Sequence, residues 1–282
     1  MKTLLILEGG GLRAIYTAGV LDCFLKNNIK VDAVIGVSAG ALFGINYLSK
    51  QQGRVIRYTL ENANNKDYMG ISSWIKTGNI MNKDFCFNKL IYETDPFDFK
   101  TFNKSKIEFY VTVTNVETGK AEYKRINDIE EDMEYLRASG SMPIVSKIVK
   151  VNGKKYLDGG ISDSVPIKWG LKNGYKRIIV VETRPKTYRK KKSKLLPYKI
   201  LYKDYPRLVK TVKERYNIYN KTKTYIEALE EENRVFVIRP TEYIKIKRIE
   251  NNKDKIQEMY RLGLKDANER LKELKKYMKW VS

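Results

Sequence analysis

Ser38 lies in the sequence GVSAG (36–40), in which glycines flank the serine two residues away on each side. Hydrolases use this GxSxG spacing to expose a serine nucleophile on a sharp turn between a strand and a helix. An apolar run precedes Ser38 and a helical pattern follows it, as that geometry requires. Serine is also a favoured helix N-cap, so this stretch alone is equally consistent with a capping role.

Asp158 is a candidate to accept a proton from such a serine. The chain contains no histidine, so the base of a serine hydrolase would have to be Lys, Asp, Glu or an N-terminal amine. Asp158 ends a short apolar segment and precedes two glycines. A free carboxylate is a weak base with a pKa of about 4, but burial beside a serine would raise that pKa. An ordinary Asp-Gly turn is the alternative interpretation.

Gly9, Gly10 and Gly11 follow an apolar run and precede a helical pattern that begins with the letters LRA. As a GxGxxA pattern, the segment suggests a dinucleotide-binding turn, which needs an acidic residue at the carboxyl end of the second strand. The candidate acid, Asp32, instead begins that strand. We therefore expect the glycine amides to face a developing oxyanion, at the same rim of the sheet as Ser38.

Two strand-turn-helix units open the chain, within residues 3–28 and 31–51. Their repetition predicts a parallel sheet flanked by helices, with both turns at the carboxyl ends of the strands. For residues 61–104 we predict a surface excursion of short helices, with a lid or a substrate-facing insertion as the alternative. Segments rich in β-branched and aromatic residues predict further strands at 106–115, 176–183 and 234–240.

The net charge of +22 is unevenly distributed, because residues 1–185 carry +7 and residues 186–282 carry +15. Such a charge attracts nucleic acid, anionic lipid or acidic substrates without choosing among them, and a solvated Lys-rich surface is the alternative. No nucleic-acid-binding motif occurs in 186–282, so we expect no specific nucleic-acid partner. An apolar stripe at helical spacing over 254–282, which includes Val281, predicts core packing in preference to a membrane-binding face.

Cys23 and Cys86 are far apart, without metal-ligand spacing and without histidine. We therefore expect no zinc site, no disulfide framework and a reducing compartment. The apolar run at the start is too short for a signal sequence, and no later run reaches the length of a membrane span. These features predict a soluble, cytoplasmic protein that can contact an anionic membrane peripherally, and they leave the oligomeric state open.

Together, three motifs resemble those of the patatin-like phospholipase family: GGGLRA (9–14), GVSAG (36–40) and DGG (158–160), in the family's order. The connections at 138–147 and 165–181 are similar too, so the resemblance covers about residues 3–184. One departure is Ala14, which stands where the family usually has glycine. The whole chain looks most like bacterial cytoplasmic members of the family that carry a C-terminal extension.

The resemblance implies lipid acyl hydrolysis through a Ser-Asp dyad on a three-layer α/β/α fold with a mainly parallel central sheet. It makes Ser38 the nucleophile, Asp158 the general base and the amides of Gly9, Gly10 and Gly11 the oxyanion hole, with no cofactor and no metal. Arg13 would contact a substrate phosphate or, as we prefer, bridge to a loop carboxylate.

We expect a patatin-like α/β hydrolase domain at 1–185 and a basic, mainly helical extension at 186–282 with one strand at about 234–239. The function that we expect is cleavage of lipid acyl esters, of the phospholipase A, lysophospholipase or esterase type. The alternatives are acyl transfer by the same dyad, or a basic protein that binds membrane or nucleic acid on a degenerate hydrolase scaffold.

Overall fold

The computed structural model describes residues 1–279. The strands are β1 (Thr3–Leu7), β2 (Ala33–Val37), β3 (Glu108–Asn115), β4 (Ala121–Ile126), β5 (Val149–Val151), β6 (Lys154–Asp158), β7 (Arg177–Val181) and β8 (Val235–Ile238). The helices are α1 (Ile15–Lys26), α2 (Ala39–Leu48), α3 (Arg54–Glu61), α4 (Ile71–Thr77), α5 (Phe99–Asn103), α6 (Met133–Gly140), α7 (Ile167–Lys172), α8 (Leu196–Leu201), α9 (Pro206–Glu231), α10 (Lys253–Glu269) and α11 (Leu271–Lys279). Residues Gly11–Ala14 (η1) and Gly159–Ile161 (η3) form short 3₁₀ turns, and Phe85–Thr94 (η2) is π-helical.

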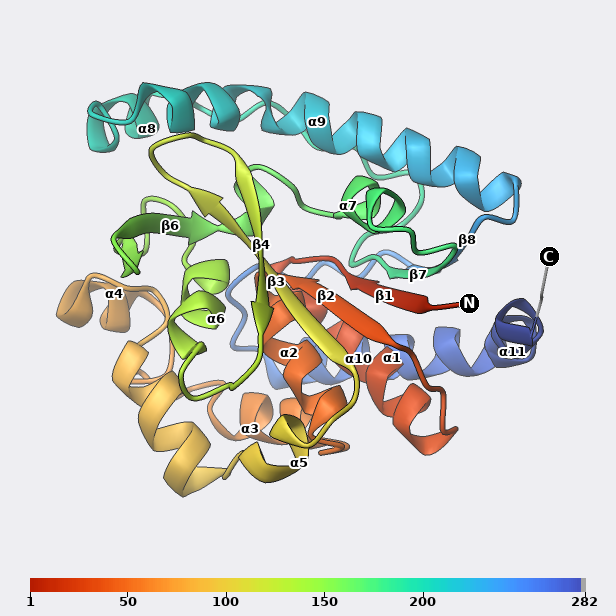
Figure 1. The fold of residues 1–282 in the computed structure, drawn as a ribbon. Coiled ribbons are helices and arrows are strands. Elements are labelled where there is room, and N and C mark those ends of the chain that lie inside the picture. Colours follow the sequence, from red (N-terminus) through yellow and green to blue (C-terminus); the bar gives the residue numbers. More distant parts are fainter. Residues whose placement is uncertain (280–282) are drawn as a thin grey trace.

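The fold is a three-layer α/β/α arrangement around one mainly parallel sheet, as the sequence predicts. Strands β3, β2, β1, β7 and β8 pair in parallel, and β4, β5 and β6 add antiparallel pairs. Helices α1, α2 and α10 cover one face of the sheet, and α7 and α9 cover the other (Figure 1). This architecture explains why the central strands are continuous apolar runs, because both of their faces are covered.

Strand β1 shows how the sheet separates two apolar cores. Leu5 and Leu7 belong to the core beneath α1, α2 and α10, whereas Leu4 and Ile6 belong to the core beneath α7 and α9. All four side chains have no exposed surface. Burying one side chain of this size stabilises a fold by about 1.5–3 kcal/mol, so alternate residues of one short strand hold both helical layers.

Strand β3 is the element that brings the ends of β2 and β6 together. Strand β4 pairs with residues 109–114 of β3 along one edge, so β2 and β6 must both use the other edge. Strand β2 ends there with Val37 opposite Thr112, and Asp158 of β6 lies opposite the next residue, Val113. The residue after Val37 and the last residue of β6 therefore meet without any loop between them.

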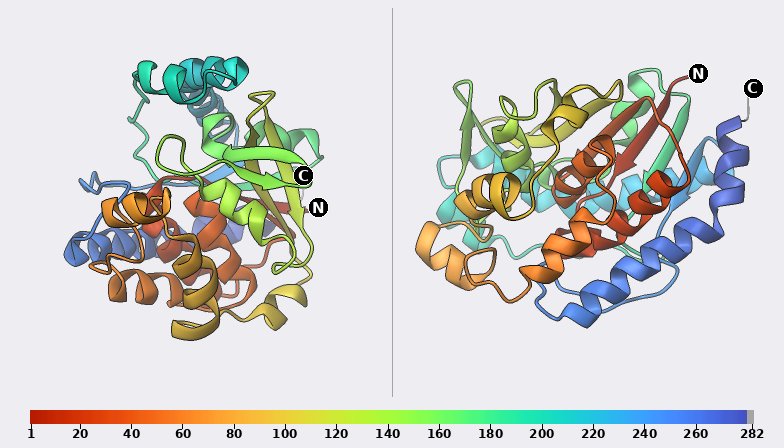
Figure 2. Two further views of the ribbon diagram at one scale, coloured as in Figure 1. Left: turned by 90° about the vertical axis from the view of Figure 1, so that its left-hand side faces the viewer. Right: turned by 90° about the horizontal axis from the view of Figure 1, so that it is seen from below.

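The C-terminal part of the chain is built into both helical layers and into the sheet (Figure 2). Strand β8 extends the parallel sheet beyond β7, within the segment predicted as a strand at about 234–239. Lys223 of α9 forms a buried ion pair with Glu182 at the end of β7, at 2.6 Å. On the other face α10 packs along α1, where Tyr16 donates a hydrogen bond to Asp266 at 2.9 Å.

The periodic pattern over 254–282 is two helices and not one, because α10 ends at Glu269 and α11 begins at Leu271. Ile256 and Leu274 of the predicted stripe are fully buried, whereas Val281 lies outside the described residues. Segment 61–104 forms α4, η2 and α5 with connecting turns. Among the described residues, no helix is long and apolar enough to cross a membrane.

Helices α1 and α10 cross closely at Gly19 and Gly263, and this contact predicts the effect of added side chains on stability. A Cβ added to Gly263 would overlap the carbonyl oxygen of Tyr16, and one added to Gly19 would overlap that of Tyr260. Gly-to-Ala changes normally stabilise a helix interior by roughly 1 kcal/mol, but overpacking costs about 1–3 kcal/mol. We expect Gly263→Ala to lower the urea midpoint, while Asn268→Ala, at an exposed position of the same helix, leaves it equal or higher. An unchanged midpoint in Gly263→Ala would contradict the close crossing.

Candidate active site

Ser38 sits on the sharp turn between β2 and α2, in a conformation with a positive φ of 55° and a ψ of −128°. Positive φ is uncommon for any residue with a side chain and is found where the surrounding structure enforces it. A glycine at position 40 permits the turn, because a Cβ there would lie 2.5 Å from the carbonyl oxygen of Leu7. The turn thus lifts the Ser38 side chain above the carboxyl edge of the sheet, as the GxSxG pattern predicts.

The Ser38 hydroxyl donates a hydrogen bond of 2.7 Å from Oγ to Oδ2 of Asp158. The backbone amide of Gly160 donates to the other oxygen, Oδ1, at 2.7 Å. Both side chains are buried, and burial is the main cause that raises the pKa of Asp158 above its ordinary value, against the opposing effects of the Ser38 hydrogen bond and of Arg215. A carboxylate held in this way can accept the hydroxyl proton, because desolvation strengthens it as a base.

Ser139, at the end of α6, holds the backbone of the turn that carries Ser38. None of the sequence motifs includes it. Its Oγ accepts a hydrogen bond from the amide of Ser38 at 2.9 Å and donates one to the carbonyl of Thr112 at 2.8 Å. The stretch 138–147, which contains Ser139, is similar to the family but carries no motif for this role. A buried serine that both donates and accepts satisfies two backbone groups at the end of β2 and in β3.

The glycine loop after β1 lies directly against Ser38. A Cβ at Gly9 would lie 2.7 Å from the carbonyl of Val37 and 2.8 Å from Cβ of Ser38. Within residues 1–279 the amides of Gly9, Gly10 and Gly11 donate no hydrogen bond, whereas Leu12 donates to the carbonyl of Arg248. Three unpaired amides beside a buried hydroxyl are donors that can stabilise a developing negative charge.

Glu8 anchors this loop and was missed at the sequence level. Its buried carboxylate accepts hydrogen bonds from the amide of Thr183 at 2.6 Å and from the hydroxyl of Tyr219 at 2.7 Å. Thr183 in turn donates to the carbonyl of Gly9 at 3.1 Å. The carboxyl ends of β1 and β7 and the helix α9 therefore share one polar network. A Glu before a glycine run carries no signal for this role, because its partners lie about 175 and 211 residues away along the chain.

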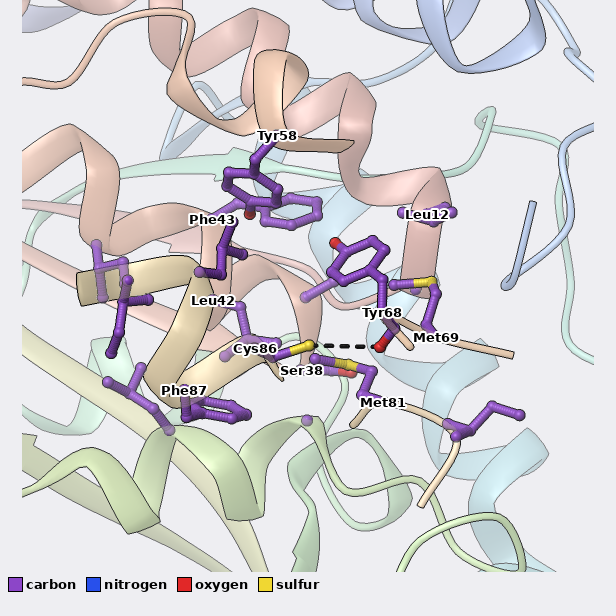
Figure 3. A pocket seen from close by; sticks show the side chains of 18 of the residues that line it. Leu12, Ser38, Leu42, Phe43, Tyr58, Tyr68, Met69, Met81, Cys86 and Phe87 are labelled. Atoms are coloured by element: carbon purple, nitrogen blue, oxygen red, sulfur yellow. Dashed lines mark hydrogen bonds between the residues drawn. The ribbon is translucent and has the colours of Figure 1, made fainter. Parts of the chain in front are cut away.

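An apolar pocket opens on one side of Ser38 (Figure 3). Its cavity volume is about 90 Å³. The segment 61–104 supplies one wall of the pocket, with Cys86 donating a hydrogen bond to the carbonyl of Tyr68, and α2 supplies another. Side chains that Figure 3 places around Ser38 include Leu12, Leu42, Phe43, Met69, Met81 and Phe87. Such a lining fits a hydrocarbon chain.

A polar cavity of about 320 Å³ opens on the other side of Ser38. Among the described residues, its lining includes two carboxylates, Glu8 and Asp158, both of which already accept hydrogen bonds. Five cationic side chains outnumber them: Arg13, Arg184, Lys190, Arg215 and Arg248. Ser38 thus lies at the junction of an apolar and a cationic space.

Arg13 lines the polar cavity, and its guanidinium Nε donates to the carbonyl of Ile246 at 3.3 Å. Burial, followed by the neighbouring Arg184 and Arg248, lowers the pKa of Arg13 to about 10. Among the described residues Arg13 has no carboxylate within ion-pair distance, so the preferred bridge to a loop carboxylate is not formed by the residues in place. Its guanidinium is directed into a space rich in positive charge.

Comparisons with known proteins show the family of the chain. The model of the family described as patatin-like phospholipase matches residues 5–168, which is more than half of the chain. The chain therefore belongs to the patatin-like phospholipase family. A second model, described as a domain of unknown function (DUF6363), matches residues 205–279.

Two relatives illustrate the range of the resemblance. The uncharacterized protein YjjU of Escherichia coli (strain K12) is 28% identical over 187 residues, which cover 64% of this chain and 52% of that protein. Lysophospholipase NTE1 of Saccharomyces cerevisiae is 27% identical over 188 residues, which cover 63% of this chain and 10% of that protein. The match thus spans about half of the first relative and about a tenth of the second. The solved structure of VipD from Legionella pneumophila aligns with a TM-score of 0.48 at 14% identity, covering 96% of this chain and 67% of that one.

The raised pKa of Asp158 generates a prediction for stability. A carboxyl whose pKa is raised by folding contributes stability at low pH, and that contribution is lost as the pH rises through the folded pKa. We expect the melting temperature of Asp158→Asn to equal or exceed that of the wild type at neutral pH. The difference between the two melting temperatures should shrink as the pH falls, because Asp158 then becomes protonated and neutral. Asp98 is a matched contrast, because hydrogen bonds from Thr101 lower its pKa, so Asp98→Asn should lose stability at neutral pH. Destabilisation of Asp158→Asn that grows from acid to neutral pH would contradict the assigned cause.

Proposed function

We propose that the protein is a serine acyl hydrolase that cleaves lipid acyl esters through Ser38 and Asp158. The observation that carries the proposal is the 2.7 Å hydrogen bond between these side chains, placed beside three unpaired glycine amides. Membership of the patatin-like phospholipase family supports lipid acyl hydrolysis at the level of the class. The name lysophospholipase, carried by the NTE1 relatives, favours a phospholipid or lysophospholipid substrate.

The proposed reaction begins when Asp158 takes the proton of Ser38 and the serine oxygen attacks the ester carbonyl carbon. The carbonyl oxygen becomes an oxyanion, which the amides of Gly9, Gly10 and Gly11 stabilise. The intermediate then expels the alcohol oxygen, which receives the proton from Asp158, and leaves an acyl-enzyme on Ser38. Asp158 next takes a proton from water, whose oxygen attacks the acyl carbon. Return of that proton to Ser38 releases the fatty acid.

The two cavities give the substrate an orientation in this proposal. The acyl chain occupies the apolar pocket lined by α2 and residues 61–104, because burial of hydrocarbon is favourable there. The alcohol part of the ester then faces the polar cavity on the other side of Ser38. No cofactor or metal takes part in this scheme, and within residues 1–279 no group of three or more Cys, Asp or Glu side chains could hold a metal ion.

We also propose that the enzyme meets an anionic lipid surface through α4 and α8. Both helices lie toward the left-hand end of the molecule in Figure 1 and in the right-hand view of Figure 2. Each carries large apolar side chains in solvent: Ile71 and Ile75 of α4 are each 73% exposed, and Leu196 and Ile200 of α8 are 68% and 63% exposed. The basic run 189–194 immediately precedes α8. Apolar side chains beside lysines and arginines suit the boundary of an anionic bilayer.

The loop at residues 142–147 lies between the end of the molecule with α4 and α8 and the site around Ser38. It lines both cavities, and it accepts a hydrogen bond from Ile80 to the carbonyl of Val145 at 2.7 Å. On its other side the amide of Ile144 donates a hydrogen bond to the hydroxyl of Tyr202 at 2.9 Å. Ile144 has a positive φ of 74°, which is strained for a β-branched residue. A lipid drawn in between α4 and α8 would therefore pass this loop before it reaches Ser38.

The division of the chain at residue 185 stays a prediction, with a hydrolase domain at 1–185 and an extension at 186–282. Cytoplasmic location also stays a prediction. The proposal for the extension is that it completes the polar cavity, because Lys190, Arg215 and Arg248 all belong to it and line that space.

Kinetics of ester hydrolysis test the dyad. We expect Ser38→Ala to abolish turnover of a fatty-acyl ester, and Asp158→Asn to lower kcat/KM by about 10²–10⁴-fold, the usual contribution of a general base. The wild-type rate should fall as the pH drops through the pKa of Asp158, which burial raises, because only the ionised carboxylate accepts the proton. Asp163→Asn is the control, since this half-buried aspartate accepts a hydrogen bond from Tyr123 and none from Ser38 among the described residues. Equal losses in both Asp variants would argue against a specific base.

Vesicle binding tests the lipid-facing surface. We expect Ile71→Ser/Ile75→Ser and Leu196→Ser/Ile200→Ser each to weaken binding to phosphatidylglycerol vesicles by at least about tenfold, since each inserted side chain contributes about 1.5–3 kcal/mol when fully buried. Ile218→Ser removes a partly exposed apolar side chain from α9 and should leave binding unchanged. Sedimentation with vesicles of graded anionic content measures the effect. Binding that is insensitive to both double changes would contradict a lipid contact through α4 and α8.

A further inference from the structure

Helix α9 presents a row of polar side chains to the carboxyl edge of the sheet at intervals of four residues: Arg215, Tyr219 and Lys223. Lys223 pairs with Glu182 at the end of β7 at 2.6 Å. Tyr219 donates to Glu8 at the end of β1 at 2.7 Å. Two members of the row thus each meet a carboxylate that follows a strand.

Arg215 breaks this pattern, because it pairs with no carboxylate within residues 1–279. Its Nε is buried and makes no hydrogen bond among the described residues. Arg215 lies beside Gly160, where a Cβ would be 3.4 Å from its Nη2. The nearby carboxylate of Asp158 has both oxygens occupied, by the hydroxyl of Ser38 and the amide of Gly160. A guanidinium with a buried, unsatisfied donor is costly unless a ligand completes it.

Two further cations of the C-terminal part face the same cavity. Lys190 extends its ammonium over the ring of Tyr219, 4.2 Å from the centroid. Burial, followed by repulsion from Arg215, lowers the pKa of Lys190 to about 7. Arg248 is exposed at the mouth and lines both cavities. Burial lowers the pKa of Arg215, and the charge of Arg248 lowers it further, against the attraction of Asp158. These groups repel one another in the absence of an anion, and a bound anion would relieve that repulsion.

We propose that Lys190, Arg215 and Arg248 form a subsite for the phosphate group of the substrate, next to the ester bond that Ser38 attacks. Arginine and lysine at one concave, partly buried place are the side chains that proteins use to bind phosphate oxygens. The inference rests on the proposed acyl hydrolase activity, which it extends by naming the group on the alcohol side of the ester. It also gives residues 186–282 a part in selecting the substrate.

The geometry of the site favours a phosphate that is part of the ester substrate over a separate phosphate ion. Ser38 lines both the apolar pocket and the cationic cavity. An ester whose acyl chain fills the first space must therefore place its alcohol part in the second. A phosphate a few bonds from the ester oxygen, as in a lysophospholipid, would reach the cationic groups, whereas a neutral glycerol would leave them unpaired.

A matched pair of esters tests the proposal. We compare kcat/KM for an acylglycerol 3-phosphate and for the neutral monoacylglycerol with the same chain, in wild type, Arg215→Gln, Arg248→Gln and Lys213→Gln. We expect the wild type to prefer the phosphate ester, and Arg215→Gln and Arg248→Gln each to lose roughly tenfold or more of that preference, the effect of a hydrogen bond to a charged group. The preference is the ratio of the two kcat/KM values within one variant, so an effect of Arg215 or Arg248 on Asp158 that changes both rates alike cancels. Lys213 is exposed on the same helix and has no place in the cavity, so Lys213→Gln should keep the preference.

Calorimetric titration with glycerol 3-phosphate, inorganic phosphate and glycerol separates this proposal from the hydrolase activity. Binding of the two phosphates that weakens in Arg215→Gln and Arg248→Gln supports the subsite even if neither ester is cleaved, in which case only the hydrolase proposal fails. Phosphate binding by the wild type without any preference between the two esters would overturn the substrate role. Absence of phosphate binding, or an ester preference unchanged in both variants, would overturn the subsite. Arg248 is exposed, so Arg248→Gln decides the result if Arg215→Gln does not fold.

Discussion

The pairing of strands along one edge of β3 is the constraint on which the site depends. Because β2 stops opposite Thr112 and β6 stops opposite Val113, the residue after one strand and the last residue of the other are brought into hydrogen-bond contact. The dyad is thus fixed by backbone register, which a shift of one residue would destroy by turning the side chain to the other face. Ser139 and the amide of Gly160 then hold each partner in place.

Two buried carboxylates lie at the carboxyl edge of the sheet, and side chains from the C-terminal part of the chain pair with them. Glu8 and Glu182 end neighbouring strands and receive Tyr219 and Lys223 from α9. Buried carboxylates of this kind are costly unless they are paired and hydrogen-bonded, so α9 stabilises the rim that holds the glycine loop. Arg215, one turn before Tyr219, extends this row to the cavity beside Asp158. One face of α9 therefore both stabilises the fold, through Tyr219 and Lys223, and lines the cationic cavity, through Arg215.

The sequence predicted the parallel strands of the sheet and both early turns, because these follow from local patterns, and the resemblance of the three motifs implied the meeting of Ser38, Asp158 and the glycines. It missed Glu8 and Ser139, which each share a hydrogen bond with a residue more than 100 positions away in the chain. It also missed Arg215, which the fold places beside Gly160. A periodic helix such as α9 shows which residues share a face, but not which strand end each one meets. The break between α10 and α11 was missed for a similar reason, since the apolar period continues across it.

Labelling with a fluorophosphonate probe, followed by peptide mapping, tests the central claim most directly, because the probe reacts only with an activated serine. The account predicts one adduct on the peptide that contains Ser38, no adduct in Ser38→Ala, and strongly slowed labelling in Asp158→Asn with the fold intact. An adduct on another serine, or labelling that persists in Ser38→Ala, would contradict it.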